Sequence, residues 1–289
     1  MLSDKIKKIK SDRSSGASQI ARNALGVLKF FAQTSKIETC RGFIGAFSEL
    51  GRMLFDMRHN MAPVQNLVAR IVYEIHSLDE DNLVKVRNFA VSRIDALCKE
   101  SDAAAKKTAE WAASKIGYSD FLATCSYSST ICETFRIAKN KGKRFKVFIA
   151  ESKSDDDKLR YGQVVANFLE SIDVSAEVFP DDEIYRYVPK TNCVLVGADS
   201  VLFDGSIING CPTYGVAVEA ADSGVPFFSV CESIKANSMS YLGKNIEAEK
   251  GFDLVPSNLI TGIITEKGIL DIKELAEIMH EKSKFFEIL

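Results

Sequence analysis

The spacing of apolar residues changes near residue 117. Before that point, apolar residues recur every three to four positions, the period of an amphipathic helix, in the stretches 17–33, 43–59, 64–78, 82–98 and 103–117. Capping side chains at 79–82 and at 101–102, and Pro63 near a first helical turn, mark three helix starts. We therefore expect an N-terminal all-helical domain over residues 1–116.

From residue 117 onward, short apolar runs alternate with longer segments that have a helical pattern. Six runs are expected strands, at 121–125, 145–151, 176–179, 193–197, 226–231 and 259–265. Strands that are apolar throughout are typical of parallel sheets covered by helices on both faces. Segments 130–141, 158–171 and 211–223 would then be crossover helices. The predicted fold class is α/β, with the helical domain followed by a doubly wound, mostly parallel Rossmann-like sheet over residues 117–289.

Composition and charge argue against nucleic acid and membranes as binding partners. The 289 residues are 46% hydrophobic and 26% charged, with 37 basic and 39 acidic side chains and a net charge of -2. That balance gives no broad attraction for nucleic acid or an anionic membrane. No apolar run approaches the length of a membrane helix, and the N-terminal stretch lacks the apolar centre of a secretion signal. We expect a cytoplasmic protein with no membrane partner and no direct nucleic-acid contact.

The seven cysteines and three histidines show no metal or disulfide pattern. The cysteines form no CxxC pair and have no histidine nearby in the sequence, and the histidines lie far apart. We therefore expect no metal ion and no organic cofactor.

Several reactive or charged side chains follow the expected strands. Ligands of open parallel sheets bind beyond the carboxyl ends of the strands. Cys125 precedes a run of hydroxyl side chains at the start of an expected helix, which indicates either a phosphate site or ordinary helix capping. Asp199 follows the strand at 193–197, where its carboxylate either accepts hydrogen bonds from loop amides or transfers a proton. Lys235 is either a phosphate ligand or a solvated lysine.

Three segments occur in an order that resembles one family. They are CVLVGADSVLFDGSIIN, VPFFSVCESIK and FDLVPSNLITGIITEKGIL. Together they resemble the family of the α, β and δ regulatory subunits of eukaryotic translation initiation factor 2B, which also includes methylthioribose-1-phosphate isomerase and ribose-1,5-bisphosphate isomerase. The resemblance covers about residues 118–275 and extends more loosely over the helical part.

The resemblance implies roles for individual residues. The isomerases carry a catalytic cysteine and a catalytic aspartate, which correspond here to Cys125 and Asp199, whereas the regulatory subunits commonly lack one or both. Lys235 matches a lysine that follows an ES or ET segment, and Asn209 matches the asparagine of an Asn-Lys-Ile-Gly-Thr motif. The implied substrate-binding set is Arg13, Gly16, Ser128, Asn209 and Lys235.

The chain departs from the isomerases at three positions. Gly210, in NGCPT, stands where their motif has a substrate-contacting lysine. Ser15 stands in place of an early arginine, with Arg13 as the neighbouring candidate for the same phosphate, and Thr124 replaces the histidine before the cysteine. Each lost charge-assisted contact costs about 1.5 to 3 kcal/mol.

Two functions stay open at this point. One is an aldose-ketose isomerase for a phosphorylated sugar, in which Cys125 and Asp199 share the proton transfer. The other is a non-catalytic regulatory subunit that senses a sugar phosphate or nucleotide and binds other initiation factor 2B-like subunits. Retention of Cys125 and Asp199 favours the isomerase, whereas the absence of the lysine and of the early arginine fits the regulatory subunit. The sequence-based prediction is the isomerase, with the regulatory subunit as the alternative. Members of this family usually dimerise through their α/β domains, so the resemblance implies a homodimer or a higher homo-oligomer.

Overall fold

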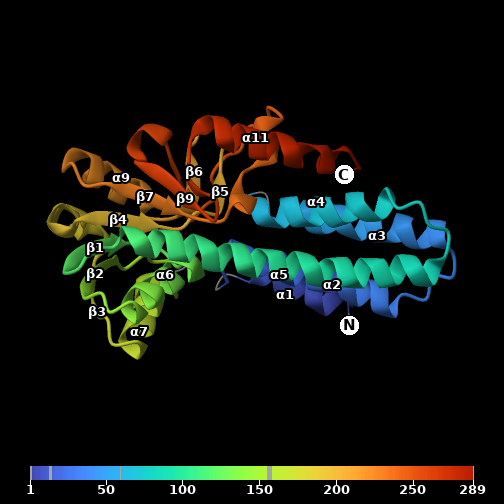
Figure 1. The fold of residues 1–289 in the computed structure, drawn as a ribbon, viewed down its shortest axis with the longest axis horizontal. Coiled ribbons are helices and arrows are strands. Elements are labelled where there is room, and N and C mark those ends of the chain that lie inside the picture. Colours follow the sequence, from blue (N-terminus) through green and yellow to red (C-terminus); the bar gives the residue numbers. More distant parts are fainter. Residues whose placement is uncertain (1, 13–14, 59, 155–157, 289) are drawn as a thin grey trace.

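The computed structural model describes residues 2–12, 15–58, 60–154 and 158–288. Helices form one end of the molecule and a sheet flanked by helices forms the other (Figure 1). The helical end consists of α1 (Leu2–Ser11), α2 (Ala17–Thr34), α3 (Cys40–Phe55), α4 (Ala62–His76) and most of α5 (Leu83–Lys115). Their apolar faces pack into one core, because apolar side chains recur at helical spacing along each of them.

The helix α5 corrects one prediction. The expected helices at 82–98 and 103–117 form this single helix, and the helix start expected at Ser101-Asp102 is wrong. Ser101 is buried within α5 and accepts a hydrogen bond from Arg22 at 3.3 Å, so its hydroxyl serves a tertiary contact instead of a cap. The start at Asn82 is confirmed, since its side chain accepts from the amides of Val84 and Lys85. The helix α1 was not among the predicted helices.

The six predicted strands are confirmed in a seven-stranded sheet. They are β1 (Asp120–Thr124), β2 (Phe145–Ala150), β3 (Ser175–Phe179), β4 (Cys193–Val196), β7 (Phe227–Val230) and β9 (Gly262–Thr265). The strand order is β10-β9-β7-β4-β1-β2-β3, and only β10 (Gly268–Leu270) pairs antiparallel. The predicted α/β class with a mostly parallel sheet is confirmed.

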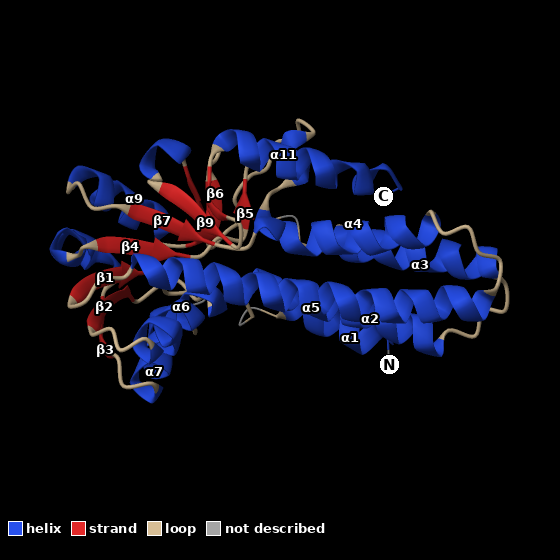
Figure 2. Ribbon diagram, in the orientation of Figure 1, coloured by secondary structure: helices blue, strands red, loops and turns tan. Residues whose placement is uncertain are grey.

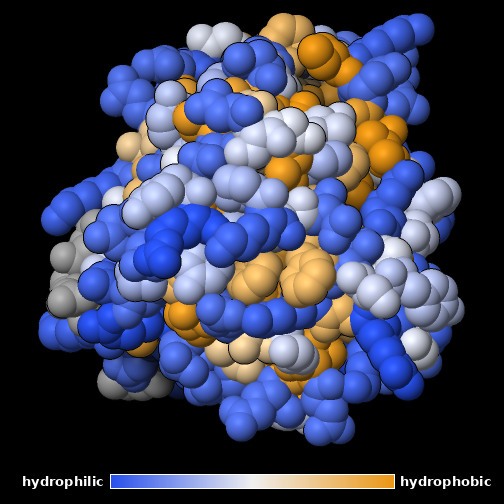
Figure 3. Space-filling model, turned by 90° about the vertical axis from the view of Figure 1, so that its left-hand side faces the viewer, coloured by the Kyte–Doolittle hydropathy of each residue, from blue (hydrophilic) through white to orange (hydrophobic). Residues whose placement is uncertain are grey.

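Helices cover both faces of this sheet (Figure 2). The end of α5, α6 (Ser129–Asn140) and α7 (Tyr161–Ser171) pack on one face. On the other face lie α9 (Thr213–Asp222) and α11 (Ile272–Ser283). The short helices α8 (Ile184–Tyr187) and α10 (Ser238–Tyr241) pack against the same core. Seen from the sheet end, hydrophilic side chains cover most of the surface and apolar ones lie in small groups (Figure 3).

The structure also contains a small antiparallel sheet. Its strands are β5 (Ser200–Val201), β6 (Ile207–Gly210) and β8 (Phe252–Val255), in the order β5-β6-β8. None of the three was predicted from the sequence, and β5 has only two residues, too few to give a periodic signal. They nevertheless fix the segment that follows β4, because the amide of Asp199 donates to the carbonyl of Ile208 at 2.8 Å.

Hydrogen bonds join the helical bundle to the ends of the strands. At the start of α4, the Ala62 amide donates to the Asp199 carbonyl at 3.2 Å. One turn further along, Asn66 Nδ2 donates to the carbonyls of Ile234 and Ala236, at 2.6 and 2.9 Å. The bundle therefore forms one wall of any site at this edge of the sheet. Within the described ranges, no helix has the length and apolar character needed to span a membrane.

Candidate functional site

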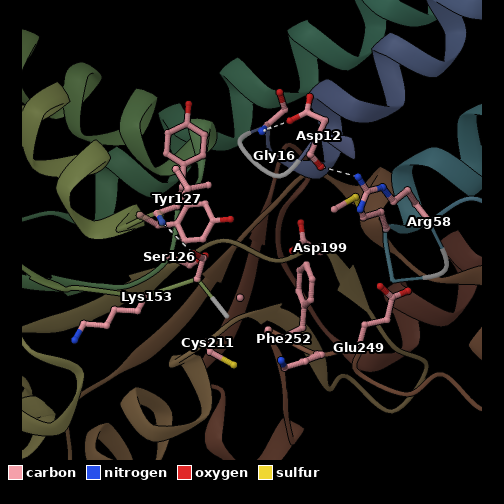
Figure 4. A pocket seen from close by; sticks show the side chains of 18 of the residues that line it. Asp12, Gly16, Arg58, Ser126, Tyr127, Lys153, Asp199, Cys211, Glu249 and Phe252 are labelled. Carbon is pink, nitrogen blue, oxygen red and sulfur yellow. Dashed lines mark hydrogen bonds between the residues drawn. The ribbon is translucent and has the colours of Figure 1, made fainter. Parts of the chain in front are cut away.

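A cavity of about 840 Å³ opens where the strand ends meet the helical bundle (Figure 4). Its walls come from the segment before α2, the residues after β1, the end of β6 and the segment that enters β8. Among its lining residues are Asp12, Gly16, Arg58, Ser126, Tyr127, Asp199, Gly210, Cys211, Glu249 and Phe252. The cavity thus lies at the edge of the sheet where the sequence predicts a ligand.

A smaller hollow continues from the cavity toward the sheet. It has a volume of about 10 Å³ and shares Gly16, Tyr127 and Asp199 with the larger cavity. Ser128, Asn209 and Lys235 also line it. The structure therefore brings Gly16, Ser128, Asp199, Asn209 and Lys235 together, although the chain places them up to about two hundred residues apart.

Two helices begin at this hollow. Gly16 precedes α2, which has no side-chain cap hydrogen bond, and Ser128 caps α6 by accepting from the Ile131 amide at 3.3 Å. The first amides of a helix lack intrahelical partners and carry a partial positive charge, which favours an anionic ligand. Gly197 lets the start of α6 approach β4, because a Cβ there would lie 2.8 Å from the Cβ of Ser128.

Asp199 is partly exposed at the boundary of the cavity and the hollow. Burial raises the pKa of its carboxyl, against the opposing effects of Lys235, the Ala17 amide and Arg58. Such a carboxyl is suited either to exchanging a proton with a ligand or to hydrogen bonding a ligand hydroxyl.

Lys235 is buried beside a second carboxylate that the sequence analysis did not single out. Its Nζ lies 3.7 Å from Oε2 of Glu232, a side chain with no solvent exposure. Glu232 also accepts from Thr130 at 2.8 Å and from Ser18 at 3.1 Å. Burial alone would raise the pKa of Glu232, but Lys235 and these hydroxyls outweigh it and lower it. Burial likewise works against charge on Lys235, yet Glu232 and Asp199 together raise its pKa, so the lysine stays charged.

Cys125 lies behind the site. Its thiol is 1% exposed, packs in the apolar core under the sheet and lies 3.3 Å from the hydroxyl of Thr213. Asn209 donates to the same hydroxyl at 2.9 Å, so Thr213 links the two. Burial raises the pKa of Cys125 to about 12 despite the Thr213 contact. Among the described residues that line the cavity and the hollow, Cys125 is absent. Its catalytic role stays a prediction.

The arginine that the structure describes at the cavity is Arg58. Arg13 is outside the described residues, so its proposed phosphate contact stays a prediction. Arg58, which the sequence analysis did not single out, lines the cavity and donates to the carbonyls of Ile9, Lys10 and Asp12, at 2.9, 3.1 and 2.6 Å. It thereby fixes the segment that leads to Gly16. No motif marked Arg58, because its contacts depend on how α1 packs.

Cys211, Glu249 and Phe252 are further cavity residues that the sequence analysis did not identify. Cys211 follows β6, Glu249 precedes β8 and Phe252 is the first residue of β8; because neither strand was predicted, no argument from strand ends identified these residues. In the part of the chain that the structure describes, no cluster of His, Cys, Asp and Glu side chains is placed to hold a metal ion.

Comparisons with known proteins identify the relatives of this chain. The model of the Initiation factor 2 subunit family matches residues 13–251. A translation initiation factor eIF-2B subunit 2-like protein of Pyrococcus abyssi is 31% identical over 286 residues, covering 93% of this chain and 98% of that protein. The ribose 1,5-bisphosphate isomerase of Methanocaldococcus jannaschii is 24% identical, covering 93% of this chain and 91% of the enzyme.

A solved structure of a relative has the same fold. The crystal structure of the Pyrococcus horikoshii OT3 translation initiation factor eIF-2B superposes with a TM-score of 0.79 and 25% sequence identity. The match covers 93% of this chain and 96% of that one. Sequence and fold thus match over nearly the whole chain.

Proposed function

Because the chain belongs to the Initiation factor 2 subunit family, we propose that its cavity binds a small phosphorylated sugar or a nucleotide. The observation that carries the proposal is the position of the large cavity, which has Gly16 and Asp199 in its wall and lies next to the start of α6, Asn209 and Lys235. The helix amides and Lys235 suit a phosphate, while Asp199 and Asn209 suit ligand hydroxyls.

We propose that the bound ligand regulates the protein and is not converted by it. Burial raises the pKa of the Cys125 thiol to about 12, so the thiol stays protonated at neutral pH. In addition, Gly210 replaces the lysine that the resemblance places in contact with substrate, and Ser126 lies against Gly210. Both features weaken an isomerase mechanism that depends on these groups.

One observation supports an isomerase as the second candidate. Asp199 faces the cavity with a raised carboxyl pKa, a property that a general acid or base requires at neutral pH. In this alternative, Asp199 removes a proton from the carbon beside the sugar carbonyl and returns it to the neighbouring carbon. The Cys125 thiol would donate a proton to the carbonyl oxygen and take one back, which requires that Cys125 become exposed to the cavity.

Binding and turnover separate the two candidates. Calorimetry and NMR with ribose 5-phosphate, ribose 1,5-bisphosphate, methylthioribose 1-phosphate and AMP should show binding to the purified protein without conversion. Lys235→Met should weaken binding, whereas Lys273→Met, at an exposed position of α11, should leave it unchanged. Conversion that is lost in both Asp199→Asn and Cys125→Ser would establish the isomerase instead. If none of the four compounds binds, the proposal is overturned.

We also propose that the chain forms a homodimer or higher homo-oligomer and binds other initiation factor 2B-like subunits. Light scattering on the purified protein should give at least twice the chain mass of 31.9 kDa. A mass of one chain at micromolar concentration would contradict the homodimer.

A further inference from the structure

One buried carboxylate joins the starts of two helices next to the cavity. Oε1 of Glu232 accepts from the Thr130 hydroxyl at 2.8 Å, and its Oε2 accepts from the Ser18 hydroxyl at 3.1 Å. Ser18 and Thr130 are the second residues of α2 and α6, and both are buried. A single side chain with no solvent exposure therefore connects the first turns of two helices that lie far apart in the chain.

The same two helix starts meet the inner end of the large cavity. Gly16, the residue before α2, and Tyr127, which precedes the α6 cap Ser128, line both the cavity and the hollow. The hollow, at about 10 Å³, has room for about one water, so an anionic group of a ligand would lie at the inner end of the cavity. The positive ends of both helices favour an anion at that place.

Glu232 also supplies negative charge where positive charge gathers. Two helix starts and the buried Lys235 ammonium lie together, which is unfavourable away from water without a counter-charge. Lys235 Nζ lies 3.7 Å from Oε2 of Glu232. Burial alone would raise the pKa of Glu232, but Lys235 and the two hydroxyls lower it overall, so the carboxyl is ionised at neutral pH. Among the described residues that line the cavity and the hollow, Glu232 is absent, so it holds the helix starts without taking up ligand space.

From this arrangement we propose that Glu232 is a positioning residue, which joins α2 to α6 so that the positive ends of both helices face one anionic group of the ligand. The inference rests on the proposed function, because it assumes that the cavity binds a phosphorylated compound. It adds the residue that keeps the two helix starts in place before the ligand arrives. Such preorganisation raises affinity, because the ligand does not have to order the two helices.

Variants of the two hydroxyl donors test this role and keep the buried charge pair. Thr130→Val keeps the shape of the side chain without its hydroxyl, and Ser18→Ala removes the other donor. Each should lower affinity about tenfold, in calorimetry with those of the four compounds named above that the wild type binds. Thr130→Ser, which restores a hydroxyl, should bind as the wild type does.

Thr134→Val is the matched control on the same helix. Thr134 is buried in α6, and its hydroxyl donates to the Thr130 carbonyl at 2.8 Å. Thr130→Val and Thr134→Val should both lower the melting temperature, since each loses a buried hydrogen bond, but only Thr130→Val should lose affinity. This difference separates positioning from a general loss of stability.

The outcomes distinguish this inference from the proposed function. If Thr130→Val or Ser18→Ala binds as tightly as the wild type, Glu232 does not position the helix starts, and the proposed function is unaffected. An equal loss of affinity in Thr134→Val would also overturn the inference. If the wild type binds none of the four compounds, the proposed function fails and the inference fails with it. Should Thr130→Val not fold, Ser18→Ala decides the test alone.

Discussion

A Cβ atom on Gly210 would lie 2.5 Å from Oγ of Ser126, well inside van der Waals contact. Ser126 cannot move away as a whole, because its amide donates to Ser152 Oγ at 2.7 Å and its φ is 58°. Only its hydroxyl can rotate. Glycine at position 210 and serine at position 126 therefore form one close contact.

Restoring the lysine of the family motif should require a second change. The double variant Ser126→Gly/Gly210→Lys should bind ribose 5-phosphate about tenfold or more tightly, because a charge-assisted hydrogen bond contributes about 1.5 to 3 kcal/mol. Glycine also suits the positive φ at position 126. Calorimetry measures the affinity, and thermal melting measures the stability. Ser126→Gly alone is the control and should leave the affinity unchanged.

The single variant tests the steric argument. Gly210→Lys alone should melt at a lower temperature than the double variant, because its Cβ contacts Ser126 Oγ. Equal melting temperatures would show that Ser126 does not restrict position 210.

Glu232 should be far more important for stability than a surface carboxylate. Glu232→Gln leaves Lys235 buried without its closest opposite charge, which should lower the free energy of unfolding by about 3 to 5 kcal/mol. Urea denaturation measures this change. Glu133→Gln removes the partner of the partly exposed Arg136 and should cost less than about 1 kcal/mol.

A second variant identifies the cause of the loss. Glu232→Gln/Lys235→Met removes both charges and should be more stable than Glu232→Gln alone. If the double variant is less stable than the single one, the loss comes from the hydrogen bonds of Thr130 and Ser18 and not from the unpaired lysine.

The sequence predicted where the site lies better than how its side chains point. Six apolar runs were enough to place the strands, and therefore to bring Asp199 and Lys235 to one edge of the sheet. The direction of Cys125 could not be predicted, because β1 ends at Thr124 and the alternation of faces has no fixed continuation beyond the strand. In the structure Cys125 joins the same core as Ala123, two residues earlier.

Contacts that depend on tertiary packing also could not be predicted from the sequence. Glu232 stands next to a strand end, but its partners Ser18 and Thr130 lie on α2 and α6, more than a hundred residues away in the chain. Phe252 reaches the cavity from β8, whose short pairing with β6 has no sequence signature. The helix α5 was divided in two for a related reason: the polar pair at 101–102 indicated a cap, while the structure uses Ser101 in a contact with Arg22.

Lys282 predicts a pH dependence of stability. It lies on α11 and donates to the carbonyl of Ser233, next to the turn that carries Lys235, with Glu266, Lys267, Arg70 and Glu281 as its charged neighbours. Burial lowers its pKa from 10.5 to about 7. Between pH 7 and 10.5 the unfolded lysine holds a proton that the folded one lacks, so the stability of the wild type rises with pH.

The comparison with Lys282→Met isolates this effect. The difference in unfolding free energy between variant and wild type should favour the variant most below pH 7, where folded and unfolded lysine are both protonated. It should then shrink as the pH rises toward 10. Urea denaturation at several pH values gives the difference directly, and Lys273→Met, on the exposed side of α11, should show no such trend. A difference that stays constant between pH 7 and 10 would contradict the low pKa.

The two cysteines near the site should differ in reactivity. Cys211 is partly exposed and lines the cavity, whereas Cys125 is buried behind it with a pKa raised to about 12. Native protein treated with a maleimide should therefore be labelled at Cys211 and not at Cys125, as peptide mass spectrometry can show. In urea, both thiols should react.

Ligand protection connects this reactivity to function. A saturating concentration of AMP or ribose 5-phosphate should slow the labelling of Cys211, because the ligand occupies the cavity that the thiol lines. Cys40, in a separate cavity between α3 and the segment that joins α4 to α5, is the internal control and should react at the same rate with or without ligand. Native labelling of Cys125 at the rate of Cys211 would mean that its thiol reaches the cavity, and the isomerase would then become the better-supported function.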